Sequence, residues 1–173
     1  LDGTLLQNDA TLSPFAREQL TRLIQAGVQI TFATARSVVS SSLILKGVPF
    51  KLPAICLNGT SINDFHTHEH LILNAIPGPL GHAIFECVLS HDCLPFVGTF
   101  NGTGERLYYS QIEHDGMNWF VQDRIRARDH RLCHTDRLEN ALEEQVIALT
   151  AIHRLPRLQA LEDDLQNRFG SHI

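Results

Sequence analysis

Three short polar motifs in this chain carry side chains that could act together on one small molecule. They are Asp2-Gly3-Thr4, Thr34-Ala35-Arg36 and Asn58-Gly59. An aspartate can give or take a proton, whereas a hydroxyl, a backbone amide and a guanidinium can hold an anion. These residue types indicate a site for a phosphate-like dianion, provided that the fold brings the three motifs to one place.

The elements around these motifs predict where their side chains lie. Residues 13–27 begin with Ser-Pro and end with Gly, which is typical of a helix. The β-branched and aromatic residues 28–33 predict a buried strand. A second helix is expected over residues 37–46, closed by a glycine. Residues 53–57 are a short apolar run that predicts another strand.

Strands that alternate with helices in this way predict an α/β fold with a parallel sheet covered on both faces. Ligands of such sheets bind at the carboxyl ends of the strands. Thr34 and Asn58 each come directly after a predicted strand. Asp2 would follow another strand that lies mostly before Leu1. We therefore expect these three polar residues to meet at one edge of the sheet.

After Asn58 the pattern changes, and the rest of the chain predicts a separate α+β unit. Pro77-Gly78-Pro79 interrupts the pattern, so we place a boundary after residue 77, giving domains of residues 1–77 and 78–173. The expected elements are a hairpin of residues 61–64 and 70–74, a helix over 80–90, a hairpin of 94–100 and 106–110, a helix over 116–127, a strand over 145–152, a helix over 158–169 and the start of a strand at 171–173.

The composition is that of an ordinary globular chain and argues against several classes of partner. The 173 residues are 43% hydrophobic and 19% charged, with a formal net charge of −5. There is no block of Lys or Arg, so we expect neither nucleic acid nor a membrane as a partner. The four cysteines are not spaced as a zinc motif or a disulfide framework. We therefore expect a reducing, cytoplasmic location.

In their order and spacing, the three motifs resemble the Cof-type, or type IIB, branch of the haloacid dehalogenase (HAD) phosphatases. The resemblance rests on motifs in the first third of the chain and on element order beyond it. It implies part of a HAD-like Rossmannoid core with an inserted α+β cap that closes over the site and selects the substrate. It also implies a Mg²⁺-dependent phosphatase that hydrolyses small phosphorylated metabolites, sugar phosphates above all, through an aspartyl-phosphate.

The resemblance assigns a role to each motif residue. Asp2 would be the catalytic acid/base, and its backbone carbonyl would bind Mg²⁺. Thr34 would bind phosphate together with the amide of Ala35, which is expected at a helix N-terminus. Arg36 would orient the aspartate or the edge of the site, and the Asn58-Gly59 turn would lie beside the phosphate. Ala35 stands where the family commonly has Gly, which adds a methyl group near the phosphate.

Other parts of the family's catalytic machinery are expected outside this chain. The attacking aspartate would lie immediately before Leu1, and position 1 is not Met, so we expect a piece of a longer protein. The later lysine and the acidic loop that holds Mg²⁺ would follow the cap. The chain by itself is therefore expected to be inactive.

Two alternatives stay open at the level of sequence. One is a degenerate HAD-like domain that binds a ligand without turnover. The other is a metal-binding module, because His66, His68 and His70 would share one face of an extended strand. Their spread of about 13 Å along a flat strand favours an exposed polar hairpin instead. The motifs specify neither the substrate nor the oligomeric state.

Overall fold

The computed structural model describes residues 1–171 and divides them into two units. The first unit is Leu1–Asn74, and the second begins at Ala75. This division lies three residues before the boundary that we placed after residue 77. The assignment of the units as HAD core and cap stays a prediction. The strand expected at residues 171–173 falls on positions outside the described part of the chain.

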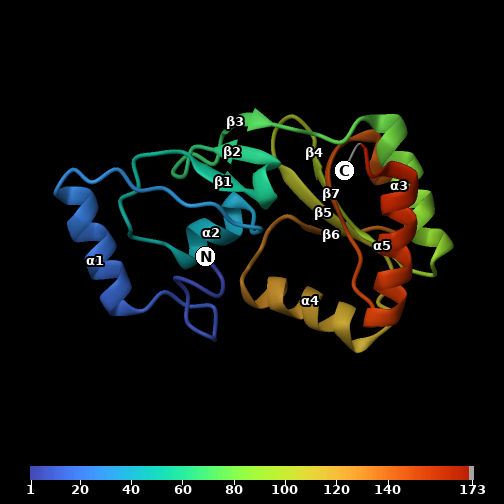
Figure 1. Cartoon of the computed structure of the whole chain (residues 1–173), viewed down its shortest axis with the longest axis horizontal. Coiled ribbons are helices and arrows are strands. Elements are labelled where there is room, and N and C mark those ends of the chain that lie inside the picture. The colour runs from blue at the N-terminus through green and yellow to red at the C-terminus, as the bar shows by residue number, and fades with distance from the viewer. Residues whose placement is uncertain (172–173) are drawn as a thin grey trace. The chain divides into compact units, whose positions relative to one another are not determined.

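The first unit contains two helices and a small antiparallel sheet, whose strands lie in the order β1-β2-β3 (Figure 1). Its first helix begins as predicted, because the Ser13 hydroxyl accepts a hydrogen bond from the amide of Ala16 at 3.1 Å. The elements are α1 (Pro14–Gln25), α2 (Val38–Ile44), β1 (Ala54–Cys56), the 3-10 helix η1 (Leu57–Gly59), β2 (Ser61–Asn63) and β3 (His70–Leu73).

The segment of residues 28–33 departs from its prediction as a buried strand. It is extended and pairs in parallel with β1 through a bridge between Ala33 and Ile55, but it forms no regular strand. Val28 is 46% exposed, and Thr31 and Ala33 are exposed as well. A parallel strand is buried when it has neighbours on both sides and covered faces. Within residues 1–171, only β1 pairs with this segment.

Three phenylalanine rings hold this segment to the core of the first unit. The rings of Phe32, Phe50 and Phe65 make edge-to-face pairs, with centroids 5.2–5.6 Å apart. Such pairs add roughly 0.5–1.5 kcal/mol each beyond the burial of their area. Phe50 and Phe65 are buried, so Phe32 anchors the segment to the core. The half-buried Ile30 packs against the same core, whereas Val28, Thr31 and Ala33 are exposed.

The second unit is a four-stranded sheet in the order β6-β5-β4-β7, with helices packed against it. Only the β5–β6 pair is parallel. Its helices and strands are α3 (Gly78–Ser90), β4 (Phe96–Phe100), β5 (Glu105–Tyr109), α4 (Asp115–Arg126), β6 (Leu132–His134), the 3-10 helix η2 (Leu138–Glu143), β7 (Gln145–Thr150) and α5 (Leu155–Phe169). The short β6 and η2 were not predicted, whereas the two helices, the hairpin, the strand and the last helix were.

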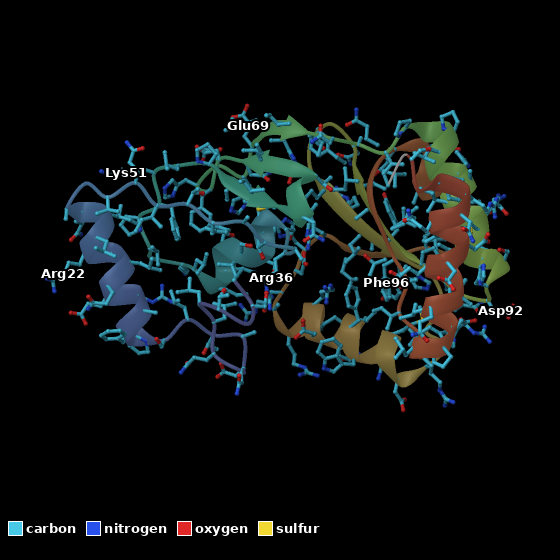
Figure 2. All side chains as sticks on the ribbon, viewed as in Figure 1. Arg22, Arg36, Lys51, Glu69, Asp92 and Phe96 are labelled. Atoms are coloured by element: carbon cyan, nitrogen blue, oxygen red, sulfur yellow. The ribbon has the colours of Figure 1, made fainter. Side chains whose placement is uncertain are left out.

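Both faces of this sheet are covered, and the alternation along β4 shows how. Phe96 packs with Met117 and Val121 of α4, whereas the next residue, Val97, packs with Phe85 of α3 and with η2 (Figure 2). Successive side chains of a strand point to opposite faces. The helices α3 and α5 lie side by side on the same face as η2 (Figure 1). No helix described within residues 1–171 is long and apolar enough to cross a membrane.

A buried ion-pair network joins β5 to the loop before β6. The guanidinium of Arg131 lies 2.7 Å from a Glu105 carboxylate oxygen and 2.6 Å from one of Asp129. Their side chains are only 4–10% exposed. Burial alone would raise the pKa of Asp129, but the hydrogen bonds and charge of Arg131 hold that pKa below its ordinary value.

We expect Arg131→Ala to lower the free energy of unfolding by about 3–5 kcal/mol, because it leaves two buried carboxylates without their cation. Urea denaturation of the chain measures this loss. Arg137→Ala is the matched control, since Arg137 pairs with Glu139 on the exposed surface and should change little. An equal loss of unfolding free energy in the two variants would contradict the stabilising role of the buried network.

The same network makes the stability depend on pH. Because the pKa of Asp129 is lowered, the contribution of its ion pair to the free energy of unfolding is present above about pH 4. This contribution is lost as the pH falls through the lowered pKa.

Candidate active site

Four backbone hydrogen bonds bring the second and third motifs together. The amide of Thr34 donates to the carbonyl of Ile55, and the amide of Ile55 donates to the carbonyl of Phe32, each at 3.0 Å. The amide of Asn58 then donates to the carbonyl of Thr34 at 3.0 Å. The fourth bond runs from Leu57 to the carbonyl of Arg36, also at 3.0 Å. The two motifs therefore have a fixed register.

The turn after β1 makes this register possible through an unusual backbone conformation. Leu57 has φ 50°, Asn58 has φ 55° and Gly59 has φ 96°. Left-handed residues cost about 1–2 kcal/mol unless they are Gly, and Asn tolerates this region better than most. The predicted Asn-Gly turn is thus present, and it aims two consecutive amides at the motif that contains Thr34.

The predicted site residues line one pocket of about 470 Å³ in the first unit. Asp2, Thr34 and Asn58, which were expected at one edge of a sheet, all contribute to its wall. Arg36 belongs to the same constellation through its contact with Asp2. The complete lining is Leu1, Asp2, Ala33, Thr34, Ala35, Ile55, Asn58 and Gly59.

Asp2 and Arg36 form a two-pronged ion pair (Figure 2 labels Arg36). The guanidinium Nε lies 2.8 Å from Oδ2 of Asp2, and Nη2 lies 2.6 Å from Oδ1. The hydrogen bond from Arg36 lowers the pKa of Asp2, and its charge acts in the same direction against partial burial. Asp2 is therefore a carboxylate near neutral pH, suited to accept a proton. Before it can donate one, it has to gain a proton against the pull of Arg36.

The ion pair has a further polar neighbour that the sequence analysis missed. The hydroxyl of Ser40 lies 3.4 Å from Nη1 of Arg36. Ser40 belongs to α2 and follows Arg36 by four residues, which is the spacing that places side chains on one side of a helical turn. This spacing is the one feature of the sequence that could have indicated the contact between Arg36 and Ser40. It does so only once the structure shows that Arg36 points back toward α2.

The residues expected to bind phosphate lie at the pocket, but one part of their expected setting is wrong. Thr34 is 8% exposed, and its hydroxyl oxygen accepts a hydrogen bond from the amide of Arg36 at 3.2 Å, so its own proton stays available. The amide of Ala35 donates to no protein acceptor within residues 1–171. The helix α2 begins only at Val38, with Ser37 as its N-cap. The amide of Ala35 therefore precedes the helix instead of lying at its N-terminus.

The donor set at the pocket matches only part of a Mg²⁺ site. Among the described residues that line it, Asp2 supplies the sole carboxylate, and both of its oxygens contact Arg36. Mg²⁺ binds in proteins through one or two carboxylates together with waters and phosphate oxygens. The residues of this chain could supply one such ligand and do not complete the site.

The three alternating histidines do not gather around a common point. A ring nitrogen of His66 lies 2.7 Å from the carbonyl oxygen of Phe50, and a ring nitrogen of His70 lies 3.3 Å from the Asn63 amide. Between them, His68 has φ 63°, so the segment turns instead of staying extended. Within residues 1–171, these histidines form no group of three donors that could hold a metal ion.

Comparison with a curated protein identifies a related enzyme. Over 84 residues the chain is 38% identical to pyridoxal phosphate phosphatase YbhA of Escherichia coli K12. This match covers 49% of the chain and 30% of the relative.

Two solved structures share the fold. A haloacid dehalogenase-like hydrolase from Bacteroides thetaiotaomicron superposes on 99% of the chain with a TM-score of 0.73 and 19% identity. A HAD/Cof-like hydrolase from Plasmodium vivax covers 97% with a TM-score of 0.72 and 15% identity. The chain spans 62% and 59% of these two structures, respectively. The predicted α/β fold of a HAD-like hydrolase is thereby confirmed.

The model of the haloacid dehalogenase-like hydrolase family matches residues 1–173, which is the whole chain. This match means that the chain belongs to the haloacid dehalogenase-like hydrolase family.

Proposed function

We propose that the protein containing this chain is a phosphoric monoester hydrolase acting on small phosphorylated metabolites, sugar phosphates above all. The observation that carries the proposal is that Asp2, Thr34 and Asn58 line one pocket. The related phosphatase of Escherichia coli supports the reaction class. A cytoplasmic location and the absence of nucleic-acid and membrane partners remain predictions.

In the proposed mechanism, an aspartate immediately before Leu1 attacks phosphorus and forms an aspartyl-phosphate. The bond from phosphorus to the substrate's oxygen breaks, and protonated Asp2 gives its proton to that leaving oxygen. Asp2, now a carboxylate, takes a proton from a water molecule as the water attacks the aspartyl-phosphate. Inorganic phosphate leaves, the attacking aspartate is restored, and Asp2 is again protonated for the next cycle.

Arg36 has two opposing effects in this cycle. Its ion pair favours the carboxylate form of Asp2, which suits the step that activates water. The same pair works against the protonated form, which the first step needs. A bound phosphate dianion would compete with Asp2 for the guanidinium, so substrate binding is expected to raise the pKa of Asp2 when its proton is required.

Thr34, Ala35 and Asn58 are proposed to hold the phosphate. The Thr34 hydroxyl has a proton to donate, and the amide of Ala35 offers a second donor. Donors that are fixed before the substrate arrives need little rearrangement as charge develops in the transition state. The backbone bonds between the two loops provide this fixed arrangement.

We expect Asp2→Asn to lower kcat of the full-length protein by about 10²–10⁴-fold, because it removes proton transfer in both steps. Release of inorganic phosphate from an aryl phosphate and from pyridoxal phosphate measures the change. Asp9→Asn is the matched control, since Asp9 is an exposed aspartate of the same unit that contacts Thr11. Activity of Asp2→Asn equal to that of the control would rule out the assigned role.

Replacing Arg36 tests the electrostatic coupling. Arg36 lowers the pKa of Asp2, so Arg36→Gln should raise that pKa, and the carboxylate should be lost at a higher pH than in the parent. The acidic limb of the pH profile of kcat is then expected to move to higher pH. Arg36→Lys, which keeps one charge without the bidentate contact, should give an intermediate shift. An acidic limb that stays in place in both variants would contradict the coupling.

We also propose that the activity requires Mg²⁺. When bound, the ion would neutralise charge on the phosphate oxygens, and the backbone carbonyl of Asp2 would be one ligand. Chelation of the full-length protein with EDTA is expected to stop phosphate release, and added Mg²⁺ to restore it. Full activity in EDTA would exclude the requirement.

A non-catalytic HAD-like binding domain is the alternative function. The open amide of Ala35 and the pocket would suffice for it, because neither depends on turnover. The two functions separate when the full-length protein is supplied with Mg²⁺ and an aryl phosphate. Binding of inorganic phosphate without any hydrolysis across several phosphate esters would favour the alternative.

A further inference from the structure

A group of three metal-compatible side chains lies in the second unit, and the proposed phosphatase mechanism does not use it. Cys87 and His91 lie one helical turn apart, at the end of α3 and its C-cap, and Asp164 lies on α5. The helices α3 and α5 lie side by side, and Asp92, labelled in Figure 2, directly follows His91, the C-cap of α3. Within residues 1–171 this is the sole group of its kind.

The donor atoms are already close enough to share one ion. Sγ of Cys87 lies 3.3 Å from Oδ2 of Asp164, and Nε2 of His91 lies 3.1 Å from the same oxygen. All three donor atoms lie within 4.8 Å of one another. Tetrahedral Zn²⁺, with bonds of about 2.0–2.3 Å, needs its ligand atoms roughly 3.3–3.6 Å apart. Small side-chain movements would therefore complete the geometry.

The combination of sulfur, imidazole and carboxylate selects among metals. A thiolate favours Zn²⁺ over Mg²⁺ and Ca²⁺, which prefer oxygen ligands. Three protein ligands leave one tetrahedral position for water. The side chains of His91 and Asp164 are 23% and 35% exposed, so this position can face solvent, while Cys87 is fully buried.

Charge and burial around Cys87, His91 and Asp164 oppose metal binding and therefore limit the affinity of this group for an ion. Burial, with help from Asp164, raises the pKa of the Cys87 thiol, so an incoming ion has to displace a proton. Nη1 of Arg168 lies 3.5 Å from Oδ2 of Asp164 and competes with a cation for that carboxylate. The hydrogen bonds from Cys87 and His91 to Asp164 show which contacts the ion would replace.

We propose that Cys87, His91 and Asp164 bind one Zn²⁺ ion, which links α3 to α5. This site is independent of the proposed phosphatase pocket, because its ligands lie on other elements and in the other unit. Its effect is structural: the ion would join two helices that otherwise meet through the apolar residues of one cluster, among them Val88 and Leu161.

The test is a titration of the metal-free chain with Zn²⁺ alone, with Co²⁺ as a spectroscopic substitute. We expect one equivalent to bind, with a thiolate-to-cobalt charge-transfer band and a rise in Tm on addition of Zn²⁺. Cys87→Ser and Asp164→Asn should each weaken binding at least tenfold and remove the rise in Tm. Cys133→Ser and Asp163→Asn, which change a partly exposed cysteine and the neighbouring aspartate, should leave binding unchanged.

Several outcomes would contradict the proposed site. Binding by Cys87→Ser as tight as that of the parent chain would overturn the site, as would a cobalt spectrum without the charge-transfer band. If Cys87→Ser fails to fold without metal, Asp164→Asn decides by the same titration, because Asp164 is partly exposed and its substitution keeps its shape. Arg168→Gln should tighten binding several-fold, and weaker binding in this variant would contradict the proposed competition. Asp2→Asn should have no effect, which separates this site from the phosphatase pocket.

Discussion

The candidate site depends on a short run of backbone hydrogen bonds between residues 32–36 and 55–58. These bonds are made by the main chain, so they hold the two loops in register whatever the nearby side chains are. They require the turn after β1 to accept left-handed conformations at three successive residues, of which Asn58 and Gly59 are suited to it. The backbone hydrogen bonds that this turn allows, and the packing of Phe32 against Phe50 and Phe65, offset the unfavourable free energy of its left-handed residues.

Electrostatics then determines what the pocket can do. Both carboxylate oxygens of Asp2 accept hydrogen bonds from the guanidinium of Arg36, which lowers the pKa of Asp2. An arrangement that favours anions also favours the ionised form of its own aspartate. Under the proposed function, the pocket would bind a dianion and hold a base by the same means, and a competing anion would make that base easier to protonate. Substrate binding and proton transfer would then be coupled through Arg36.

The second unit is organised by burial of its sheet and by pairing of the polar groups that this burial removes from water. Its sheet is covered on both faces, so its strands carry apolar residues on both sides, and the buried charged side chains of Glu105, Asp129 and Arg131 pair with one another. The Arg131 network and the contacts among Cys87, His91 and Asp164 both satisfy this requirement. In the first network one guanidinium is shared by two carboxylates, whereas the second is a donor set that suits Zn²⁺.

Local signals in the sequence determined much of this protein. Ser13, Pro14 and Gly27 delimit the first helix as predicted, since caps and breakers act within a few residues. The Asn-Gly turn and the hairpins follow from equally local preferences. Membership in the family was also readable from motif order, and the prediction that Asp2, Thr34 and Asn58 meet rested on the general rule that strand ends share an edge.

Other features were decided by tertiary structure alone. Exposure of residues 28–33 depends on which strands flank them, which their own composition cannot encode. The short β6 pairs with β5 next to the bond between Arg131 and Glu105, a contact across 26 positions. Asp164 meets His91 across 73 positions, so no spacing rule could find that group. A side chain's partner is set by packing of distant elements, whereas its backbone preference is set by its immediate neighbours.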